Sequence, residues 1–341
     1  MKTSYDLYLI TGASGFLGKV LVRSLLDRGK RVRVLVLRGD PSEKELPREA
    51  EITYGSVTEP DSMKAFFEGD LSHACLVHCA GIISIASTAP RYLWDINVNG
   101  SRNVMEACIR YGVAKAVHVS SVHAIPEKPK GKIMSEVSVF TKKSVRGKYA
   151  KSKAEATGLV LDYASKGLNV SVVLPSGILG PYDEGRGNIA SAIISFCNRR
   201  LPLAVKGGYD FVDVRDVVQG IFECSEKGRA GECYILSGHY LTLKDILGHL
   251  SRLGYGKEPV YLPLAFVKII SPFCELAGLL RRKPLFLTPY SAYTLGTNSM
   301  FSHAKAQREL GYAPRKIQVT LNSMVNWLKK RKRIPEIKEL S

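Results

Sequence analysis

Tyr149 and Lys153 are the residues of this sequence whose types and spacing most directly suggest chemistry. They are four residues apart in a stretch with helical periodicity, so both side chains are expected on one helix face and in one cleft. A free tyrosine has a pKa of about 10 and is a poor base at neutral pH, but a neighbouring ammonium group favours the phenolate. Ser121 follows an apolar strand run, where its hydroxyl can hydrogen-bond a reacting oxygen. The three residues predict a proton-transfer site.

A glycine loop stands near the start of the chain. Gly12, Gly15 and Gly18 lie between an apolar run at residues 7–10 and a helical pattern at residues 16–28. Glycines in this context let the backbone approach a pyrophosphate, whose charge the following helix N-terminus stabilises. The alternative is that the glycines serve only a tight strand-to-helix turn. The loop predicts a dinucleotide site, to which the neighbouring residues Ser14, Phe16 and Leu17 would also contribute.

The end of the second predicted strand, residues 31–37, bears on the choice of dinucleotide. Arg38 stands there, twenty residues after Gly18, where an acidic residue would hydrogen-bond the ribose of NAD. A guanidinium group can instead pair with the 2′-phosphate of NADP, and Lys44 can assist. We therefore expect NADP. In the alternative, Arg38 stacks on adenine and Asp40 binds the ribose of NAD.

The elements that must position these residues alternate between short apolar runs and longer helical patterns. This rhythm predicts an α/β fold with a doubly wound, Rossmann-like parallel sheet and a smaller C-terminal α/β substrate lobe. The dinucleotide-binding domain is expected over residues 1–180 and the substrate lobe over 181–335, with strands near 205–236 that can return to the first domain. The predicted strands are 7–10, 31–37, 74–79, 116–120 and 169–174, and the predicted helices between them are 16–28, 61–67, 92–111 and 149–165.

Composition places the chain among folded proteins. It has 341 residues, of which 45% are hydrophobic and 23% charged, so neither a disordered nor a fibrous chain fits. The seven cysteines include no C-x-x-C pair, which argues against a disulfide scaffold or a zinc site and favours reduced thiols in the cytoplasm. No bound metal is expected. The N-terminus lacks a secretory pattern, and the apolar stretch 259–280 is interrupted by charges and prolines, so no membrane span is predicted.

The formal net charge of +18 permits an anionic ligand, a nucleic-acid surface or a membrane-facing surface. The basic excess is concentrated at residues 127–148 and 329–333. Neither segment has the interleaved aromatic residues of a single-strand-binding platform, so nucleic-acid binding is not expected. Both are interpreted as a solvated loop and a basic helix end, with peripheral membrane contact through the tail as an alternative.

Several motifs occur in one order along the chain. A Tyr-x-x-x-Lys pair alone also occurs on exposed helices, but here it accompanies other motifs. These are Gly12/Gly15/Gly18, His78-Cys79-Ala80-Gly81, Asn97-Val98-Asn99-Gly100, Ser120-Ser121, Tyr149/Lys153 and Pro175-Ser176-Gly177-Ile178-Leu179-Gly180-Pro181. Together they resemble the extended short-chain dehydrogenase/reductase family, also called the NAD-dependent epimerase/dehydratase family, over essentially the whole chain.

The resemblance implies roles for these residues. Tyr149 would be the acid/base, Lys153 would hold the ribose hydroxyls and lower the tyrosine pKa, Ser121 would donate to the substrate oxygen, and Asn97 would support the cofactor side. Ser56 stands where the family usually has an aspartate that contacts adenine, which is a departure from the pattern. The further cofactor-binding residues implied are Ser56, Val57, Cys79, Ala80, Gly81, Ser120, Pro175, Gly177 and Ile178. The family's paired helices, here 90–111 and 149–165, also imply a homodimer.

The branch of the family is suggested by other positions. Val122-His123 replaces the acidic pair of the sugar-nucleotide dehydratases, and Arg38 and Leu174-Pro175 differ from the epimerase pattern. The segment 301–312 looks more like dihydroflavonol reductases and 3β-hydroxysteroid dehydrogenases. We therefore expect an NAD(P)-dependent oxidoreductase for a bulky, apolar ketone or alcohol, steroid-like or flavonoid-like. A sugar-nucleotide 4-epimerase and a non-catalytic cofactor-binding regulator are the alternatives.

Some remaining residues are assigned to substrate binding or to the scaffold. Leu264 and Phe266, with Phe273, lie in the unusually apolar stretch 259–280, which is interpreted as a core helix of the smaller lobe. The alternative hypothesis is that these residues wall an apolar substrate pocket. His123 is interpreted as a loop residue. The aspartates of the segment 211–217 are interpreted as scaffold, with Asp216 near a helix N-cap.

Overall fold

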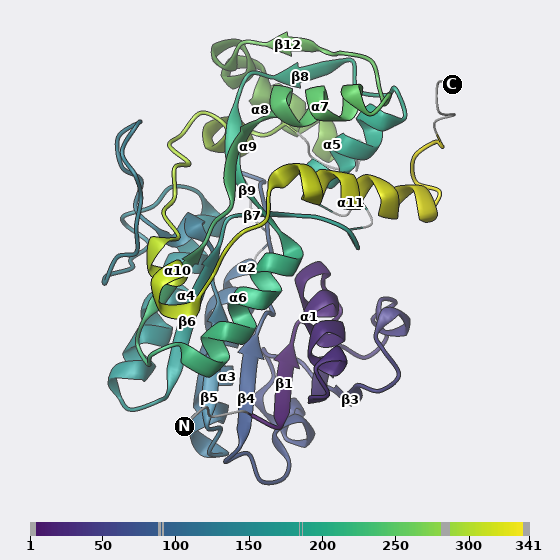
Figure 1. The fold of residues 1–341 in the computed structure, drawn as a ribbon. Coiled ribbons are helices and arrows are strands. Elements are labelled where there is room, and N and C mark those ends of the chain that lie inside the picture. Colours follow the sequence, from purple (N-terminus) through teal and green to yellow (C-terminus); the bar gives the residue numbers. More distant parts are fainter. Residues whose placement is uncertain are drawn as a thin grey trace.

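The computed structural model describes residues 5–87, 90, 92–183, 185, 187–280 and 287–336. It consists of a large lobe built on a parallel sheet and a smaller lobe beyond the carboxyl ends of several of its strands (Figure 1). The lobes share elements, because the chain crosses between them more than once after residue 175.

The central sheet has seven strands, all parallel, in the order β10-β6-β5-β4-β1-β2-β3. Since β1 pairs with both β2 and β4, the direction of winding reverses at β1, as in a doubly wound fold. The predicted sheet is therefore confirmed, and β3 is a strand that the sequence patterns missed. The strands are β1 Leu7–Thr11, β2 Arg31–Val36, β3 Glu51–Tyr54, β4 Ala74–His78, β5 Lys115–Val119, β6 Val170–Pro175 and β10 Cys233–Leu236.

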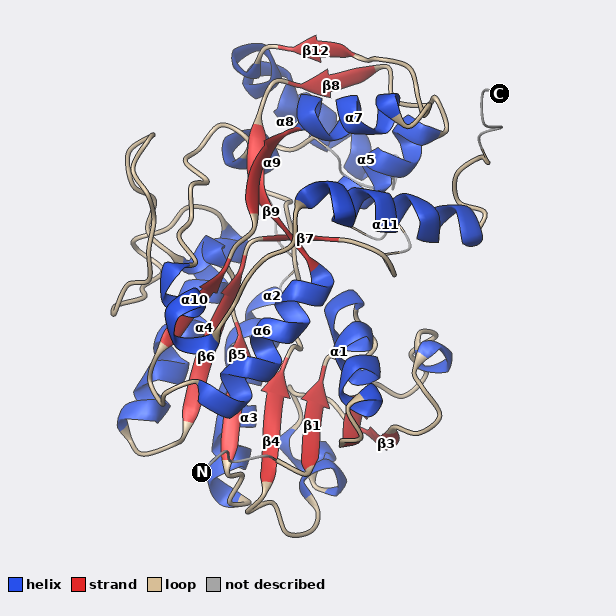
Figure 2. Ribbon diagram, viewed as in Figure 1, coloured by secondary structure: helices blue, strands red, loops and turns tan. Residues whose placement is uncertain are grey.

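Helices cover both faces of this sheet (Figure 2). Helices α1 (Phe16–Asp27) and α6 (Val214–Lys227) pack their apolar sides on one face, and α3 (Gly100–Arg110) and α4 (Lys148–Ser165) pack on the other. A single helix at residues 61–67 was a wrong prediction, because two short 3₁₀ turns occupy this segment. The short elements here are the 3₁₀ turns Glu43–Glu45, Pro60–Met63, Ala65–Phe67 and Val122–Ala124, the helix α2 (Tyr92–Trp94) and the π-helical turn Asp95–Asn99.

The smaller lobe has its own core and two small sheets. One sheet has the order β11-β9-β7, and β12 pairs with β8 in the other. Helix α10 (Ala304–Leu310) instead packs with α6 and β10 on the large lobe. The remaining strands are β7 Gly177–Leu179, β8 Leu203–Val205, β9 Gly208–Asp213, β11 His239–Thr242 and β12 Val260–Leu262. The remaining helices are α5 Asn188–Cys197, α7 Leu243–Arg252, α8 Leu264–Leu280, α9 Pro289–Thr294 and α11 Ile317–Lys330.

Candidate active site

The glycine loop joins β1 to α1, and its backbone packs closely against the end of β4. Gly12 has φ of +69°, a conformation that suits glycine, and a Cβ on it would lie 2.6 Å from the Ala80 nitrogen. A Cβ on Gly18 would overlap the carbonyl oxygen of Gly12. The amide of Cys79 donates to the Thr11 carbonyl at 3.2 Å, which holds the two strand ends together. Gly12, Gly18, Cys79 and Ala80 are thus brought into one place.

The N-terminus of α1 presents free backbone donors beside this loop. Gly15 is the N-cap residue, and within the described chain no side chain caps this helix and no acidic residue stands in its first turn. The first amides of a helix have no partner within it, and they attract anions. Ser14, Phe16 and Leu17 belong to the same turn and are partly exposed. This cradle, which a Cβ would fill, fits the pyrophosphate of a dinucleotide.

The expected adenosine side of the site lies at the ends of β2 and β3. Arg38 follows β2, is exposed, and stacks its guanidinium group 5.1 Å from the centre of the Tyr54 ring. The Ser56 hydroxyl hydrogen-bonds Thr58 at 2.8 Å. Val57 is buried against α3, where a Cβ on Gly100 would lie 2.7 Å from its Cγ2. Arg38 and Ser56 are therefore placed where a ligand can reach them, and Val57 mainly supports the helix.

Lys153 and Asn97 meet beside Gly81, just after β4. The Lys153 ammonium donates to the Val119 carbonyl at 3.0 Å, and a Cβ on Gly81 would lie 3.3 Å from Nζ and 3.2 Å from Asn97 Oδ1. Asn97, in the π-helical turn, hydrogen-bonds both the amide and the carbonyl of Ile82 at 2.8 and 3.0 Å. The asparagine thus fixes the loop that passes the lysine.

Tyr149 stands one helical turn before Lys153 on α4 and is buried, with 6% of its surface exposed. Burial raises the pKa of Tyr149 to about 12, while a hydrogen bond with Ser121 acts in the opposite direction. Burial also lowers the pKa of Lys153 to about 8. At neutral pH the phenol therefore carries its proton and the lysine is mostly charged. The residue that lowers the tyrosine pKa here is Ser121, and the expected effect of Lys153 stays a prediction.

The two serines that follow β5, Ser120 and Ser121, have different roles. Ser120 turns inward and bonds Thr157 of α4 at 2.6 Å, which ties the strand end to the helix that carries Tyr149. Ser121 caps the 3₁₀ turn Val122–Ala124 and accepts from the amide of His123 at 3.2 Å. The structure therefore places Ser121 with Tyr149 and makes Ser120 a support.

The segment after β6 forms the boundary between the lobes. Pro175 ends β6, and Gly177 and Ile178 belong to β7. A Cβ on Gly177 would lie 2.9 Å from the ring of Phe211 and 3.0 Å from the carbonyl of Asp210, so this glycine permits close packing on β9. The predicted contacts of these three residues with a cofactor stay predictions.

His123 is a functional candidate that the sequence interpretation dismissed as a loop residue. Its Nε2 lies 3.0 Å from the hydroxyl of Tyr209 and its Nδ1 lies 3.1 Å from that of Tyr290, and its ring contacts the Tyr149 ring edge to face at 5.6 Å. Burial lowers the pKa of His123 to about 4. A neutral imidazole has one donor and one acceptor nitrogen, so one of the two tyrosines must accept from it. That tyrosine keeps its own O–H free for another acceptor beside Tyr149.

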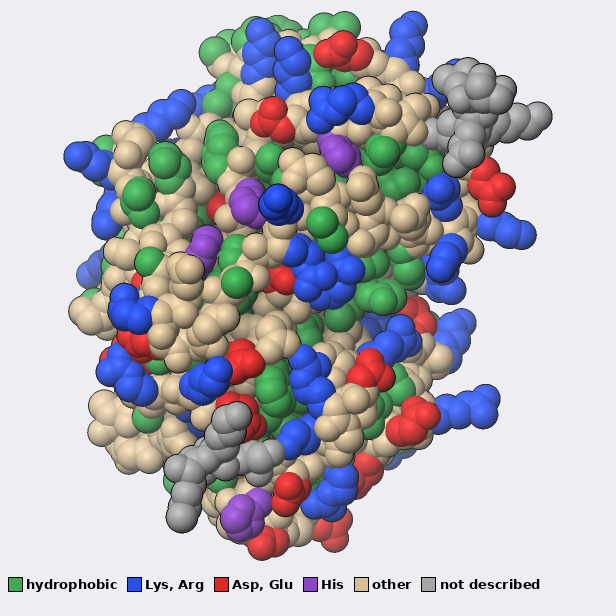
Figure 3. Space-filling model, in the orientation of Figure 1, with side chains coloured by type: hydrophobic (Ala, Val, Ile, Leu, Met, Phe, Trp, Pro, Cys, Tyr) green, Lys and Arg blue, Asp and Glu red, His purple; other side chains and the backbone are tan. Residues whose placement is uncertain are grey.

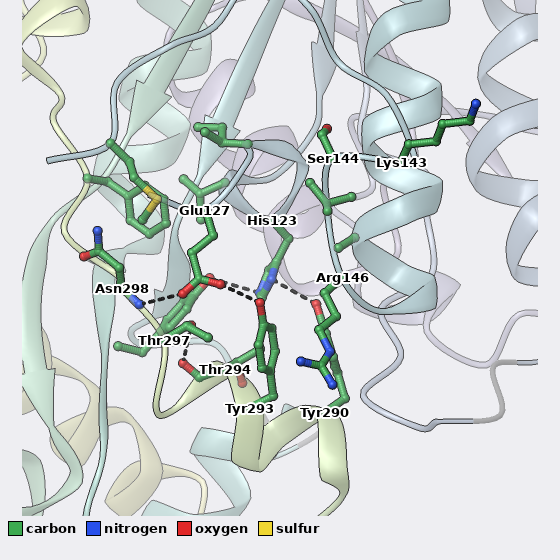
Figure 4. A pocket seen from close by; sticks show the side chains of 17 residues that line it. His123, Glu127, Lys143, Ser144, Arg146, Tyr290, Tyr293, Thr294, Thr297 and Asn298 are labelled. Atoms are coloured by element: carbon green, nitrogen blue, oxygen red, sulfur yellow. Dashed lines mark hydrogen bonds between the residues drawn. The ribbon is translucent and has the colours of Figure 1, made fainter. Parts of the chain in front are cut away.

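A cavity of about 300 Å³ lies beside His123, whose side chain forms part of its wall (Figure 4). Its wall combines apolar side chains with charged ones. Glu127 accepts from the hydroxyl of Tyr293 at 2.5 Å and from the amide of Asn298 at 3.2 Å, and Arg146 stacks 4.8 Å from the Tyr293 ring. The lining also includes Val122, Ile125, Met134, Lys143, Ser144, Val145, Ala150, Tyr209, Tyr290, Thr294, Thr297 and Phe301.

The hypothesis of an apolar wall from α8 was wrong. Phe266 is 49% exposed and Phe273 is 72% exposed, on the outside of the molecule, and neither they nor the partly buried Leu264 line this cavity. The helix is rotated so that smaller and polar residues face the protein. Within the described parts of the chain, no helix is long and apolar enough to cross a membrane, and no group of three or more His, Cys, Asp or Glu side chains could hold a metal ion.

The aspartates at the start of α6 serve the scaffold, and Asp216 lies near the N-cap as predicted. Asp213, not Asp216, is the N-cap, and its carboxylate accepts from the amide of Arg215 at 2.8 Å. Asp216, three residues after the cap in the first turn of α6, binds the amide and Nε of Arg315 at 2.8 and 2.7 Å. These ion pairs tie α6 to the chain that enters α11.

Comparison with known proteins agrees with this geometry. The model of the NAD dependent epimerase/dehydratase family matches residues 8–237, which is more than half of the chain. The chain belongs to this family. Its members depend on a nicotinamide cofactor, and the loop, the α1 N-terminus and the Tyr149–Lys153 pair described above fit such a group.

Individual relatives cover almost all of this family member. The chain is 31% identical to sterol demethylase protein B of Methylococcus capsulatus, over 95% of this chain and 98% of that protein. It is 29% identical to a putative dihydroflavonol 4-reductase of Synechocystis, over 94% of each chain. Among solved structures, gox2253 superposes with a TM-score of 0.83 at 29% identity, covering 97% of this chain and 100% of that one. A UDP-glucose 4-epimerase of Thermotoga maritima superposes at 0.77 with 22% identity, over 96% and 99%, and shows the shared fold.

Proposed function

We propose that this family member is an NADP-preferring oxidoreductase that interconverts a ketone and a secondary alcohol on a bulky, largely apolar substrate. The observation that carries the proposal is the buried Tyr149 hydroxyl, held beside Ser121 and one helical turn from Lys153. Its raised pKa keeps a transferable proton on the phenol at neutral pH. A protonated phenol is the form needed to donate a proton to a carbonyl oxygen as it is reduced.

Each residue then has a defined task. The glycine loop and the α1 N-terminus bind the pyrophosphate, and Lys153, steadied beside Asn97 and Gly81, faces the ribose side. The nicotinamide, when bound, supplies the hydride for the carbonyl carbon in reduction and accepts it in oxidation. Ser121 hydrogen-bonds the carbonyl oxygen and orients it, and Tyr149 transfers its proton to that oxygen. Lys153, whose pKa is lowered to about 8, can return a proton to the phenolate.

The substrate class is supported by the relatives and by the wall beside Tyr149. The relatives include proteins named for sterol and dihydroflavonol chemistry and a human 3 beta-hydroxysteroid dehydrogenase type 7, at 28% identity over 90% of this chain and 91% of that protein. The rings of His123, Tyr209 and Tyr290 give the site broad aromatic surfaces, and charged side chains such as Glu127 and Arg146 line the adjoining cavity. Flat multi-ring substrates stack on such surfaces.

Arg38 supports the preference for NADP. It is exposed, and its only described ring contact is the stacking on Tyr54, so the guanidinium group can meet a 2′-phosphate. We expect Arg38→Asp to lower the affinity for NADPH about tenfold to a hundredfold and to leave NADH binding equal or better, because a charge-assisted hydrogen bond contributes about 1.5–3 kcal/mol. Fluorescence titration with both cofactors measures this. Equal affinity of the native protein for the two would contradict the preference.

The decisive experiment compares Tyr149→Phe with the native protein. The substitution removes only the hydroxyl, so cofactor affinity should stay within about twofold while kcat falls about 10²–10⁴-fold. Turnover is followed as NADPH consumption on steroid and flavonoid ketones, and in parallel as UDP-sugar interconversion. A variant that keeps more than about a tenth of native kcat would show that Tyr149 is not the acid/base. Sugar interconversion without net cofactor consumption would replace the proposal by an epimerase.

A further inference from the structure

The outer face of α8 is apolar along its length. Its exposed large residues recur at alternating intervals of three and four, which puts them on one stripe of the helix. Their exposed fractions range from 49% to 77%, and they are Phe266, Ile269, Phe273, Leu276 and Leu280. Single exposed apolar side chains are ordinary on proteins, but a contiguous stripe of this size marks an interaction surface.

The inner face of the same helix carries two polar side chains, those of Ser271 and Glu275. Val267 and Ser271 are fully buried, and Glu275 is 6% exposed. The Glu275 carboxylate accepts from the amide and the hydroxyl of Ser87 at 2.7 and 2.8 Å. The one acidic side chain of α8 therefore points into the protein, and the five large apolar side chains of the stripe point out. This is the reverse of the polarity that a helix on a water-facing surface adopts.

Exposed lysines lie near the start of α8. Lys268 is exposed on α8 itself, and Lys206 is exposed after β8, whose last residue pairs with Leu262 just before the helix. Lys257 is also exposed, but it stands before β12, next to the exposed Glu258. The amide of Lys206 hydrogen-bonds the carbonyl of Leu262, two residues before α8 begins. Figure 3 shows hydrophobic and basic side chains, together with some acidic ones, at the end of the molecule where β8 and β12 lie. The protein as a whole carries a net charge of +18.

From the reversed polarity and the nearby lysines we infer that α8 docks the protein on a lipid membrane with anionic headgroups. In this arrangement the stripe enters the boundary between headgroups and acyl chains, and the lysines lie at the level of the headgroup charges. A second copy of the chain is a poorer occupant of the stripe. A two-fold contact through α8 would bring the lysines of both copies together, and like charges across an interface oppose association.

Membrane docking at α8 places the lipid close to the active site. Helix α9 packs against α8 and carries Tyr290, which hydrogen-bonds His123. Ser87, the partner of Glu275, lies in the loop that begins at Gly81 beside Lys153. The docking face and the site therefore share two short segments of chain.

Flotation of the full-length protein with vesicles tests the inference. The native protein is expected to float with vesicles of phosphatidylcholine mixed with phosphatidylglycerol, and to float less with phosphatidylcholine alone. Ile269→Ser with Phe273→Ser should lower the vesicle partition coefficient about tenfold or more, because two large apolar side chains no longer enter the lipid. The matched control is Ile133→Ser with Val139→Ser, which are 59% and 67% exposed in the basic loop. The control should float as the native protein does.

A cysteine already present on α8, next to Phe273 of the stripe, gives a second readout that needs no substitution. Cys274 is exposed, whereas the other six cysteines are buried or partly buried, so a polarity-sensitive dye can be attached to it. The emission should shift to the blue with the anionic vesicles. Failure of the native protein to float, or loss of flotation in the control pair alone, would overturn the inference. So would a light-scattering result in which the α8 pair converts a dimer to a monomer without changing vesicle binding.

Discussion

Gly12 offers a test of how the glycine loop is built. Replacing it by alanine forces a side chain into the left-handed region, at φ of +69°, which costs about 1–2 kcal/mol. The new Cβ would also lie 2.6–2.8 Å from three backbone atoms of Cys79 and Ala80, and overpacking of this kind costs about 1–3 kcal/mol. The free energy of unfolding should therefore fall by about 2–5 kcal/mol.

Gly29 provides the matched control. It has φ of +72° in the turn between α1 and β2, but nothing lies within 4 Å of the position its Cβ would take. Gly29→Ala should cost only the conformational part, about 1–2 kcal/mol, and leave cofactor binding unchanged. The difference between the two variants in lost free energy of unfolding measures how tightly the loop packs on the end of β4.

The assay for both variants is urea unfolding together with a fluorescence titration with NADPH. Gly12→Ala should also weaken NADPH binding at least about tenfold, because the loop must shift away from Cys79 and Ala80 to make room for the new Cβ. A tenfold loss of affinity corresponds to about 1.4 kcal/mol of binding free energy. Equal losses of stability in Gly12→Ala and Gly29→Ala, with native cofactor affinity in both, would refute the reasoning. Such a result would mean that the space around Gly12 is larger than the distances in the structure indicate.

Two further predictions concern charge. Lys153, whose pKa is lowered to about 8, loses its proton as the pH rises through 8. The value of kcat/KM for reduction should therefore be flat below pH 8 and fall about tenfold per pH unit above it. A pH–rate profile that stays flat to pH 10 would contradict this prediction. Asp216→Ala should lower the free energy of unfolding by about 1.5–3 kcal/mol, because it removes both bonds to Arg315, and urea unfolding measures it. Asp61→Ala, at an exposed pair with Lys64, should change nothing measurable, and a similar loss there would show that the buried position of Asp216 is not the cause.

Features that depend on neighbours along the chain could be predicted from the amino-acid sequence. The glycine spacing between a strand and a helix predicts the phosphate loop because the geometry of one strand-to-helix turn sets it. Tyr149 and Lys153 share a helix face because a helix turns once in 3.6 residues. The alternation of apolar runs and helical patterns was enough to predict the parallel sheet, although the short strand β3 and the two 3₁₀ turns near residue 63 had too little pattern to be recognised.

Contacts between segments that are far apart in the sequence became known only from the folded chain. His123 becomes part of the site because Tyr209 and Tyr290, 86 and 167 residues further along the chain, reach its two ring nitrogens. The outward rotation of α8 accompanies the bond from Ser87 to Glu275 across 188 residues. The periodicity of a helix shows that it has an apolar face, but whether that face meets the core, a cavity or the surface depends on what the rest of the chain places against it.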